Sequence, residues 1–157
     1  MMPEFKRNLL KDPPHLLKSF HYEDVLGFLD LGKEVRFQKG DTIVNENDKV
    51  DSAYLIATGK VGIWREGIEL AQLEKGNFLG ETFLFSKQNR MAKVVCEEES
   101  ILLSFQRYDV LNFFRKKPEK LFNIFTKNII EIQQNKINNM NNHMLNLKKR
   151  LLKSDNW

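Results

Sequence analysis

FLGETFLFSKQNRMA, residues 78–92, carries the most informative pattern in this chain. A Gly80-Glu81 pair comes near its start, an apolar run long enough for one or two helical turns follows, and Arg90 stands nine positions after the glutamate. This separation is too long for an i,i+4 ion pair on one helix. A turn between the two charges would instead let both face one small ligand.

The residue types in this segment suit a nucleotide. A carboxylate can accept a hydrogen bond from a sugar hydroxyl, and a guanidinium can donate two parallel hydrogen bonds to a phosphate. Backbone N–H groups that open a short helix after Gly80 would add donors for an anion, and glycine lets that backbone come close. The segment therefore predicts a site for a phosphorylated ligand.

The flanking sequence has the pattern of a small antiparallel β domain between helices. Short β-prone runs separated by glycines favour a barrel or jelly roll over a βαβ sheet. The predicted strands are 35–37, 41–44, 53–57, 60–64, 94–96 and 101–104, and Gly40, Gly59, Gly67 and Gly76 lie between the earlier ones. Helices are predicted at 15–31, at 108–115 and after Pro118, and residues 1–14, with three prolines, are expected to be irregular at their start.

The segment resembles the phosphate-binding cassette of the cyclic nucleotide-binding domain. That domain is shared by the catabolite activator family, protein kinase A regulatory subunits and cyclic-nucleotide-gated channels, and its cassette reads roughly F-G-E-[LI]-[AGS]-[LF], a variable loop, then R-x-A. Further similar turn and strand motifs run from about Glu34 to Ser104. The resemblance implies a mainly β protein: an antiparallel jelly-roll barrel with flanking helices, followed by a long C-terminal helix. The cassette residues kept here are Gly80, Glu81, Leu84, Arg90 and Ala92.

The resemblance also implies roles for the cassette. Gly80 would permit close backbone approach, Glu81 would accept from the ribose 2′-hydroxyl, and Arg90 would pair with the cyclic phosphate. Counting onward from Arg90, Asn135 and Lys136 fall near the polar residues that touch the purine in the activator family. Without the resemblance, Glu81 is simply a first-turn helix acid, and Arg90 a surface arginine after a loop.

Three positions depart from the family pattern. Thr82 replaces an aliphatic residue, Phe83 stands where a small residue is usual, and Met91 replaces a residue that often carries a hydroxyl. A threonine after the arginine is associated with cyclic GMP in the family, so Met91 favours cyclic AMP, with cyclic GMP as the other candidate. Phe83 leaves an alternative open: it closes the pocket, and the protein is a dimerisation or scaffold module without nucleotide.

The C-terminal region has a heptad pattern. Apolar and small polar residues recur at alternating steps of four and three, which is typical of a coiled-coil seam. A stripe this narrow on so long a helix cannot be buried on one barrel along its whole length, so we expect a homodimer through residues 126–151, as the resemblance also implies. The seam positions are Thr126, Ile130, Gln133, Ile137, Met140, Met144, Leu147 and Leu151, with Gln133 expected to help fix the register.

Composition narrows the function further. The chain has 157 residues, a formal net charge of +4, and no apolar run near the ~20 residues of a membrane span. No signal peptide is evident, so a cytoplasmic protein that does not bind membranes is expected. Neither a nucleophilic triad nor zinc-ligand spacing is present, which predicts no enzyme activity and no metal. Haem ligation by Cys96 or His21 is conceivable, but a core thiol and a surface imidazole are favoured.

These arguments give one predicted organisation. Residues 1–117 would hold the N-terminal helices and the nucleotide-binding barrel, whose core is 32–106, and residues 118–157 would form the dimerisation helix. Nothing in the sequence supplies a helix-turn-helix output domain, so no specific DNA binding is expected. The partners predicted are a second copy of the chain, a cyclic nucleotide and a downstream protein.

Overall fold

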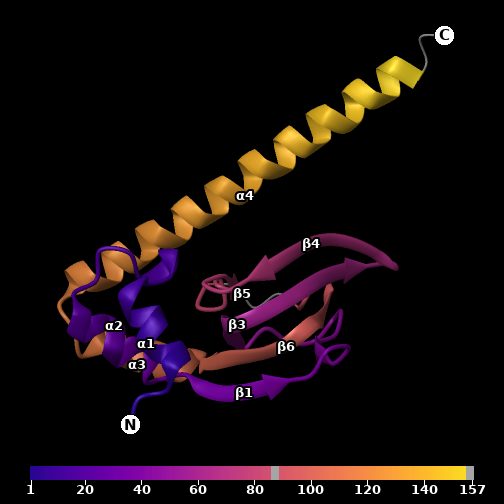
Figure 1. Ribbon diagram of the computed structural model, residues 1–157. Coiled ribbons are helices and arrows are strands. Elements are labelled where there is room, and N and C mark those ends of the chain that lie inside the picture. Colours follow the sequence, from indigo (N-terminus) through magenta and orange to yellow (C-terminus); the bar gives the residue numbers. More distant parts are fainter. Residues whose placement is uncertain (86–88, 155–157) are drawn as a thin grey trace.

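The computed structural model describes residues 1–85 and 89–154. Lys87 and Gln88 of the predicted loop 87–89, and the last three residues of the predicted C-terminal helix, lie outside these ranges. Helices gather at one end of a β-sheet, and the last helix runs past the sheet into solvent (Figure 1). The elements are α1 (Glu4–Lys11), the 3₁₀ turn η1 (His15–Leu17), α2 (Tyr22–Leu29), β1 (Lys33–Phe37), β2 (Thr42–Val44), β3 (Ser52–Arg65), β4 (Ile68–Glu74), β5 (Phe78–Leu79), β6 (Lys93–Gln106), α3 (Arg107–Arg115) and α4 (Glu119–Ser154).

The six strands pair antiparallel, as predicted. The order is β1-β6-β3-β4, with β2 also paired to β6 and β5 to β3. The two 14-residue strands β3 and β6 are the centre of the sheet and pair with each other from Ser52–Gln106 to Trp64–Lys93. Pairing within the described ranges does not close the sheet into a ring. The mainly β jelly-roll class with flanking helices and a long C-terminal helix is confirmed.

Two pairs of predicted strands are in fact single strands. Segments 53–57 and 60–64 are both part of β3, and segments 94–96 and 101–104, with the three glutamates between them, are all part of β6. Register shifts between Thr58 and Val61 mark β-bulges, which bend a strand without ending it. Gly59 has a φ of +97° there, and a Cβ on it would lie 2.0 Å from Ser100 Oγ. The glycine therefore allows close strand contact at the bend.

Strand β4 is absent from the predicted strands. It follows β3 through a two-residue turn, Glu66-Gly67, with φ values of +52° and +76° and with Arg65 opposite Ile68. Positive φ at both turn residues is the type I′ geometry that matches the twist of paired strands. The mixed apolar and polar residues of Ile68–Glu74, which follow Gly67, were the sequence signal that could have predicted this strand.

The main hydrophobic core lies between the helices and the sheet. Phe28, Phe105, Phe114 and Phe125 are all buried there, none of them more than 7% exposed. The rings of Phe28 and Phe105 stack with centroids 5.0 Å apart, and those of Phe114 and Phe125 lie 4.7 Å apart. Since Phe105 comes from β6 and Phe125 from α4, this aromatic cluster fixes the base of α4 on the sheet.

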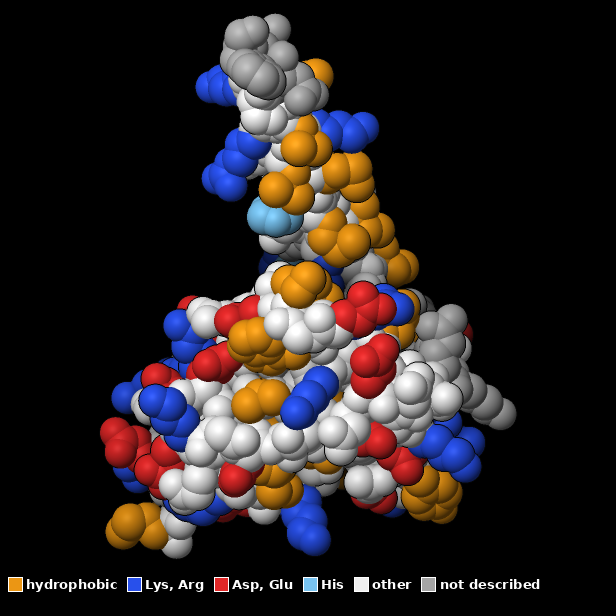
Figure 2. Space-filling model, turned by 90° about the vertical axis from the view of Figure 1, so that its right-hand side faces the viewer, with side chains coloured by type: hydrophobic (Ala, Val, Ile, Leu, Met, Phe, Trp, Pro, Cys, Tyr) orange, Lys and Arg blue, Asp and Glu red, His pale blue; other side chains and the backbone are white. Residues whose placement is uncertain are grey.

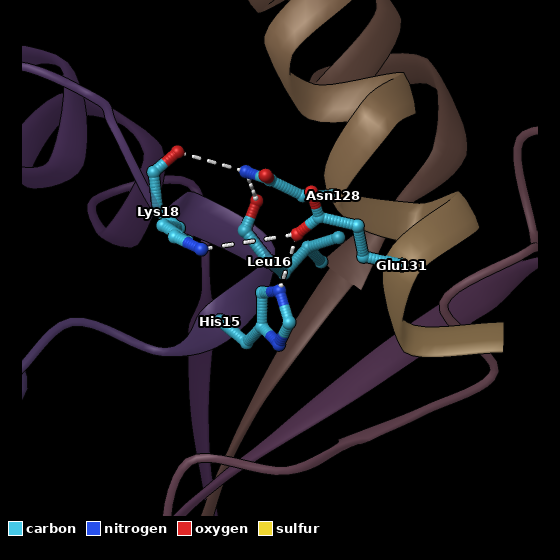
Figure 3. A network of polar contacts seen from close by, with 5 residues as sticks. All are labelled: His15, Leu16, Lys18, Asn128 and Glu131. Atoms are coloured by element: carbon cyan, nitrogen blue, oxygen red, sulfur yellow. Dashed lines mark hydrogen bonds and ion pairs between the residues drawn. The ribbon is translucent and has the colours of Figure 1, made fainter. Parts of the chain in front are cut away.

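The N-terminal region differs from the prediction. Residues 4–11 form α1, which the flanking prolines had obscured, and the single helix predicted at 15–31 is divided into η1 and α2. Ser19, with φ +71°, lies in the break. Asn128 of α4, only 3% exposed, donates to the carbonyls of Leu16 (3.0 Å) and Lys18 (2.9 Å) (Figure 3). These two carbonyls therefore accept from α4, where a continuous helix would have required them for its own ladder.

Helix α4 has two parts with different surroundings. Leu121, Phe125 and Ile129 are buried against the domain, whereas every residue from Gln134 to Ser154 is exposed. Hydrophobic side chains follow one side of this exposed outer part of α4, residues 134–154 (Figure 2). No helix within the described ranges is long and apolar enough to cross a membrane.

Candidate functional site

Gly80 and Arg90 lie against each other. Gly80 has a φ of +73°, and a Cβ at this position would be 2.3 Å from Arg90 Nη1. Only glycine leaves room for the guanidinium and adopts this backbone without strain. After Gly80 the chain forms successive turns, with Phe83 N donating to Gly80 O (3.0 Å) and Phe85 N to Thr82 O (2.9 Å), so the predicted helical turns are present only as this short turn series.

Arg90 is buried, with 9% of its surface exposed. Its Nη2 donates to the carbonyl of Ser52 at 2.7 Å, and its backbone N–H donates to Asp48 O at 2.6 Å. Nε is buried and finds no hydrogen-bond partner among the residues that the structure describes. Burial lowers the pKa of Arg90, an effect that Tyr54 and the nearby carboxylates partly oppose. A buried guanidinium with an unused donor is an environment that an anion would complete.

Glu81 is more deeply buried than Arg90, at 3% exposed. Its Oε1 accepts hydrogen bonds from Gln133 Nε2 and Lys136 Nζ, both on α4. The residue predicted to accept from a ribose therefore contacts α4 in this structure. Lys136, which the resemblance places near the purine, pairs with this carboxylate. Gln133, predicted at a coiled-coil seam, makes a contact within its own chain.

A cavity of about 260 Å³ lies between the sheet and α4. Glu81 lines it, as does Asn135, so the structure brings these two predicted residues together. Arg90 is not among the lining residues. Sequence reasoning assigned no site role to His15, Leu73, Gly76, Asn77, Phe78, Ile132 and Asn139, although Phe78 opens the segment 78–92.

Phe83 packs in the main hydrophobic core and is 1% exposed. It does not line the cavity, so its position gives no support to a pocket filled by this ring. Its carbonyl accepts from Arg107 Nε at 2.7 Å, and Arg107 Nη2 donates to Val50 O at 2.9 Å. Arg107 thus holds the cassette to the loop before β3, a role that its place after the last strand did not reveal.

The remaining cassette residues lie at the surface or half-buried. Thr82 and Ala92 are half-buried, and the Met91 side chain is exposed. Met91 follows Arg90 directly and its side chain is exposed. Because this side chain is a thioether, it offers a ligand no hydroxyl at this position. Glu81 and Arg90 are therefore the buried charged residues of the cassette, and Gly80 beside them is half-buried.

The two residues considered for haem ligation, Cys96 and His21, have different surroundings. Cys96 is buried in the sheet, where its Sγ lies 2.7 Å from Glu98 O and 3.3 Å from Ser100 Oγ, whereas His21 is exposed. Within residues 1–85 and 89–154 no group of three or more His, Cys, Asp or Glu side chains is arranged to hold a metal ion. The thiol has the surroundings of a core residue.

A second contact zone joins α4 to the N-terminal segment beside the cavity. His15 Nε2 and Glu131 Oε2 are 3.0 Å apart, and Lys18 Nζ is 4.0 Å from the same oxygen (Figure 3). The hydrogen bond from His15 lowers the pKa of Glu131, and nearby Lys18 acts in the same direction. Together with Asn128, these contacts position the stretch of α4 that lines the cavity.

The family model of the cyclic nucleotide-binding domain matches residues 34–117 of the sequence. The chain belongs to this family. This cyclic nucleotide-binding domain is 35% identical over 71 residues to the cGMP-dependent protein kinase of Toxoplasma gondii, a match that covers 45% of this chain and 7% of the kinase. It is 30% identical over 101 residues to human cGMP-dependent protein kinase 2, which covers 60% of this chain and 13% of that kinase. The chain thus spans only a small part of these relatives.

Solved structures show the same fold. Thermus thermophilus catabolite activator protein superposes with a TM-score of 0.71 at 25% identity, covering 85% of this chain and 63% of that protein. A cyclic nucleotide-binding domain from Methylobacillus flagellatus superposes with a TM-score of 0.79 at 18% identity, covering 90% of this chain and 83% of the other. The second likeness, at its low identity, speaks for the fold alone.

Proposed function

We propose that this chain is a non-catalytic sensor that binds one cyclic nucleoside monophosphate, with Arg90 on the cyclic phosphate and Glu81 on the ribose 2′-hydroxyl. The observation that carries the proposal is the buried Arg90 guanidinium, whose Nε has no hydrogen-bond partner among the described residues. An unpaired buried donor is costly, and a charged one more so. A phosphate would satisfy this donor and offset the desolvation of the cation.

Cyclic AMP is the favoured ligand in this proposal. Met91, next to Arg90, offers no hydroxyl to a guanine. The matched relatives are named as cGMP-dependent kinases, which supports cyclic GMP as the competing ligand. Both nucleotides therefore belong in the binding experiment.

The output of the proposed sensor is the outer part of α4. Its exposed apolar residues would pair with a second copy of the chain through residues 126–151, in the cytoplasm and without sequence-specific DNA contact. Because α4 contacts Glu81 through Gln133 and Lys136, ligand binding at Glu81 would bias the position of the helix. A downstream protein would respond to that position.

The test is a calorimetric titration of the full chain with cyclic AMP and cyclic GMP. Wild type should bind about one nucleotide per chain. Arg90→Ala should lose about 100-fold in affinity, because truncating one partner of a buried charge pair costs about 2–5 kcal/mol. Arg36→Ala is the matched control, since Arg36 is exposed on β1 and pairs with Glu34. Equal affinities for Arg90→Ala and wild type would overturn the assignment, and no binding of either nucleotide to wild type would overturn the function.

A further inference from the structure

We propose that Lys136 competes with the nucleotide 2′-hydroxyl for Glu81, and so sets both the affinity for ribonucleotides and their preference over 2′-deoxy analogues. The inference rests on the proposed function. It assigns to Lys136 a role in specificity that differs from the purine contact expected from its place in the sequence.

The hydrogen bonds of Glu81 carry the first step. Its Oε1 accepts from both Gln133 and Lys136. A carboxylate oxygen has about two lone-pair positions, so these two donors occupy this oxygen fully. A sugar hydroxyl can donate to Oε1 only after one of them has left.

Exposure decides which donor leaves. Of the two donors, Lys136 is the more exposed, with 46% of its side chain exposed, whereas Gln133 is half-buried and the Glu81 side chain is only 4% exposed. A buried carboxylate needs a partner at all times, whereas a half-exposed ammonium can return to water at modest cost. Lys136 is therefore the group that yields, and the incoming hydroxyl takes its place on Glu81.

The size of the cavity agrees with this competition. Lys136 and Glu81 both line it, and its volume of about 260 Å³ lies below the roughly 300 Å³ at which ligand pockets commonly begin. The ion pair joins the sheet side of the cavity to α4, so it holds the two walls together. A hydroxyl that takes over Oε1 replaces this contact with one of its own, whereas a ligand without that hydroxyl leaves the ion pair in place.

The sequence that surrounds Lys136 on α4 offers its ammonium group few carboxylates other than Glu81. From Ile132 to Ser154 the sequence contains no aspartate or glutamate. Once displaced, the ammonium has no carboxylate to pair with along this stretch of α4. A 2′-hydroxyl that displaces Lys136 must therefore offset the loss of the ion pair, which lowers the apparent affinity of a ribonucleotide.

The experiment compares Lys136→Met with wild type, using cyclic AMP and 2′-deoxy cyclic AMP in calorimetry on the full chain. Loss of the competitor should tighten cyclic AMP binding about tenfold, the effect of roughly 1.4 kcal/mol. Binding of the 2′-deoxy analogue should stay unchanged, because that ligand offers Glu81 no hydroxyl. The ratio of the two affinities should thus rise about tenfold.

Two further variants control for charge and for folding. Lys149→Met removes one positive charge from the exposed outer part of α4 and should behave as wild type. Lys136→Arg keeps a cation opposite Glu81, so it should fold and should retain the wild-type affinity ratio. Unchanged or weaker cyclic AMP binding by Lys136→Met overturns the competition while leaving the sensor function intact. Absence of nucleotide binding in all four proteins overturns both.

Discussion

At the scale of single residues, the site depends on a glycine that admits an arginine. Gly80 adopts a positive φ and leaves the space that Arg90 Nη1 occupies. The same turn then presents Glu81 to α4. Backbone geometry at one position thus controls where both charged groups of the cassette lie.

Gly80→Ala should therefore reduce stability and ligand binding together. The left-handed backbone alone costs an L-residue about 1–2 kcal/mol, and displacement of Arg90 adds to it, so we expect a loss of about 2–3 kcal/mol. Urea unfolding measures the stability, and calorimetry with cyclic AMP should show a loss of affinity of at least about tenfold.

Gly40→Ala separates the backbone effect from the contact with Arg90. Gly40 has a φ of +92° but nothing within 4 Å of a Cβ placed on it. This variant should lose only the backbone contribution and should bind nucleotide as wild type does. Equal effects of the two substitutions on binding would argue against the role of Gly80 in positioning Arg90.

Residue identity pointed in advance to some of the residues that the fold brings together. Gly80, Glu81 and Arg90 are recognisable because their spacing is local and their chemistry suits a nucleotide. Gln133 and Arg107 were not recognised, since each acts on a group that only the fold brings near: the Glu81 carboxylate and the Phe83 carbonyl. Such contacts leave no periodic or local pattern in a sequence.

At the scale of secondary-structure elements, the contact between η1 and α4 includes a carboxyl whose pKa is shifted. The hydrogen bond from His15 lowers the folded-state pKa of Glu131. A lowered carboxyl pKa contributes stability above the unfolded value and loses it as the pH falls through the folded value. The wild-type protein should therefore lose this contribution below about pH 4.5, the ordinary glutamate value.

Glu131→Gln tests this pH dependence. The variant should be slightly less stable than wild type at neutral pH, and the difference should vanish towards pH 3, as measured by urea unfolding at a series of pH values. Glu98→Gln, at an exposed position of β6, is the matched control and should show no such convergence. A constant difference between Glu131→Gln and wild type across the series would refute the linkage.

The elements that were predicted correctly are those with local signals. Strands β1 and β2 follow the β-prone runs closely, and α3 begins one residue before its predicted start. The break between η1 and α2 was missed because the amide that satisfies its carbonyls, that of Asn128, lies more than 100 residues away in the chain. The apolar residues on both sides of the break still have near-helical spacing, so periodicity alone could not locate it.

At the scale of the whole molecule, the outer part of α4 predicts self-association. Ile137, Met140 and Met144 are each more than half exposed, in a stripe that has no partner within the described residues of this chain. We expect sedimentation to give a dimer for wild type and a monomer for Met140→Asp, since a buried unpaired carboxylate at the seam would weaken association by about 100-fold or more.

Asn142→Asp is the control for this prediction. It adds the same charge to the same exposed part of α4 but lies outside the predicted seam, and it should remain dimeric. A monomeric wild type, or a Met140→Asp variant that still dimerises, would contradict the predicted seam.

Helix α4 is continuous, so a change of tilt near its base would move its far end. The helix has no proline or glycine between Glu119 and Ser154, so nothing in its sequence favours a hinge. From Lys136 to Ser154 it rises about 27 Å, and a tilt of about 10° at Lys136 would sweep the far end through about 5 Å. In the proposed sensor, this displacement would scale with helix length, so shortening residues 134–154 by whole turns would reduce it in proportion while leaving the proposed nucleotide site untouched.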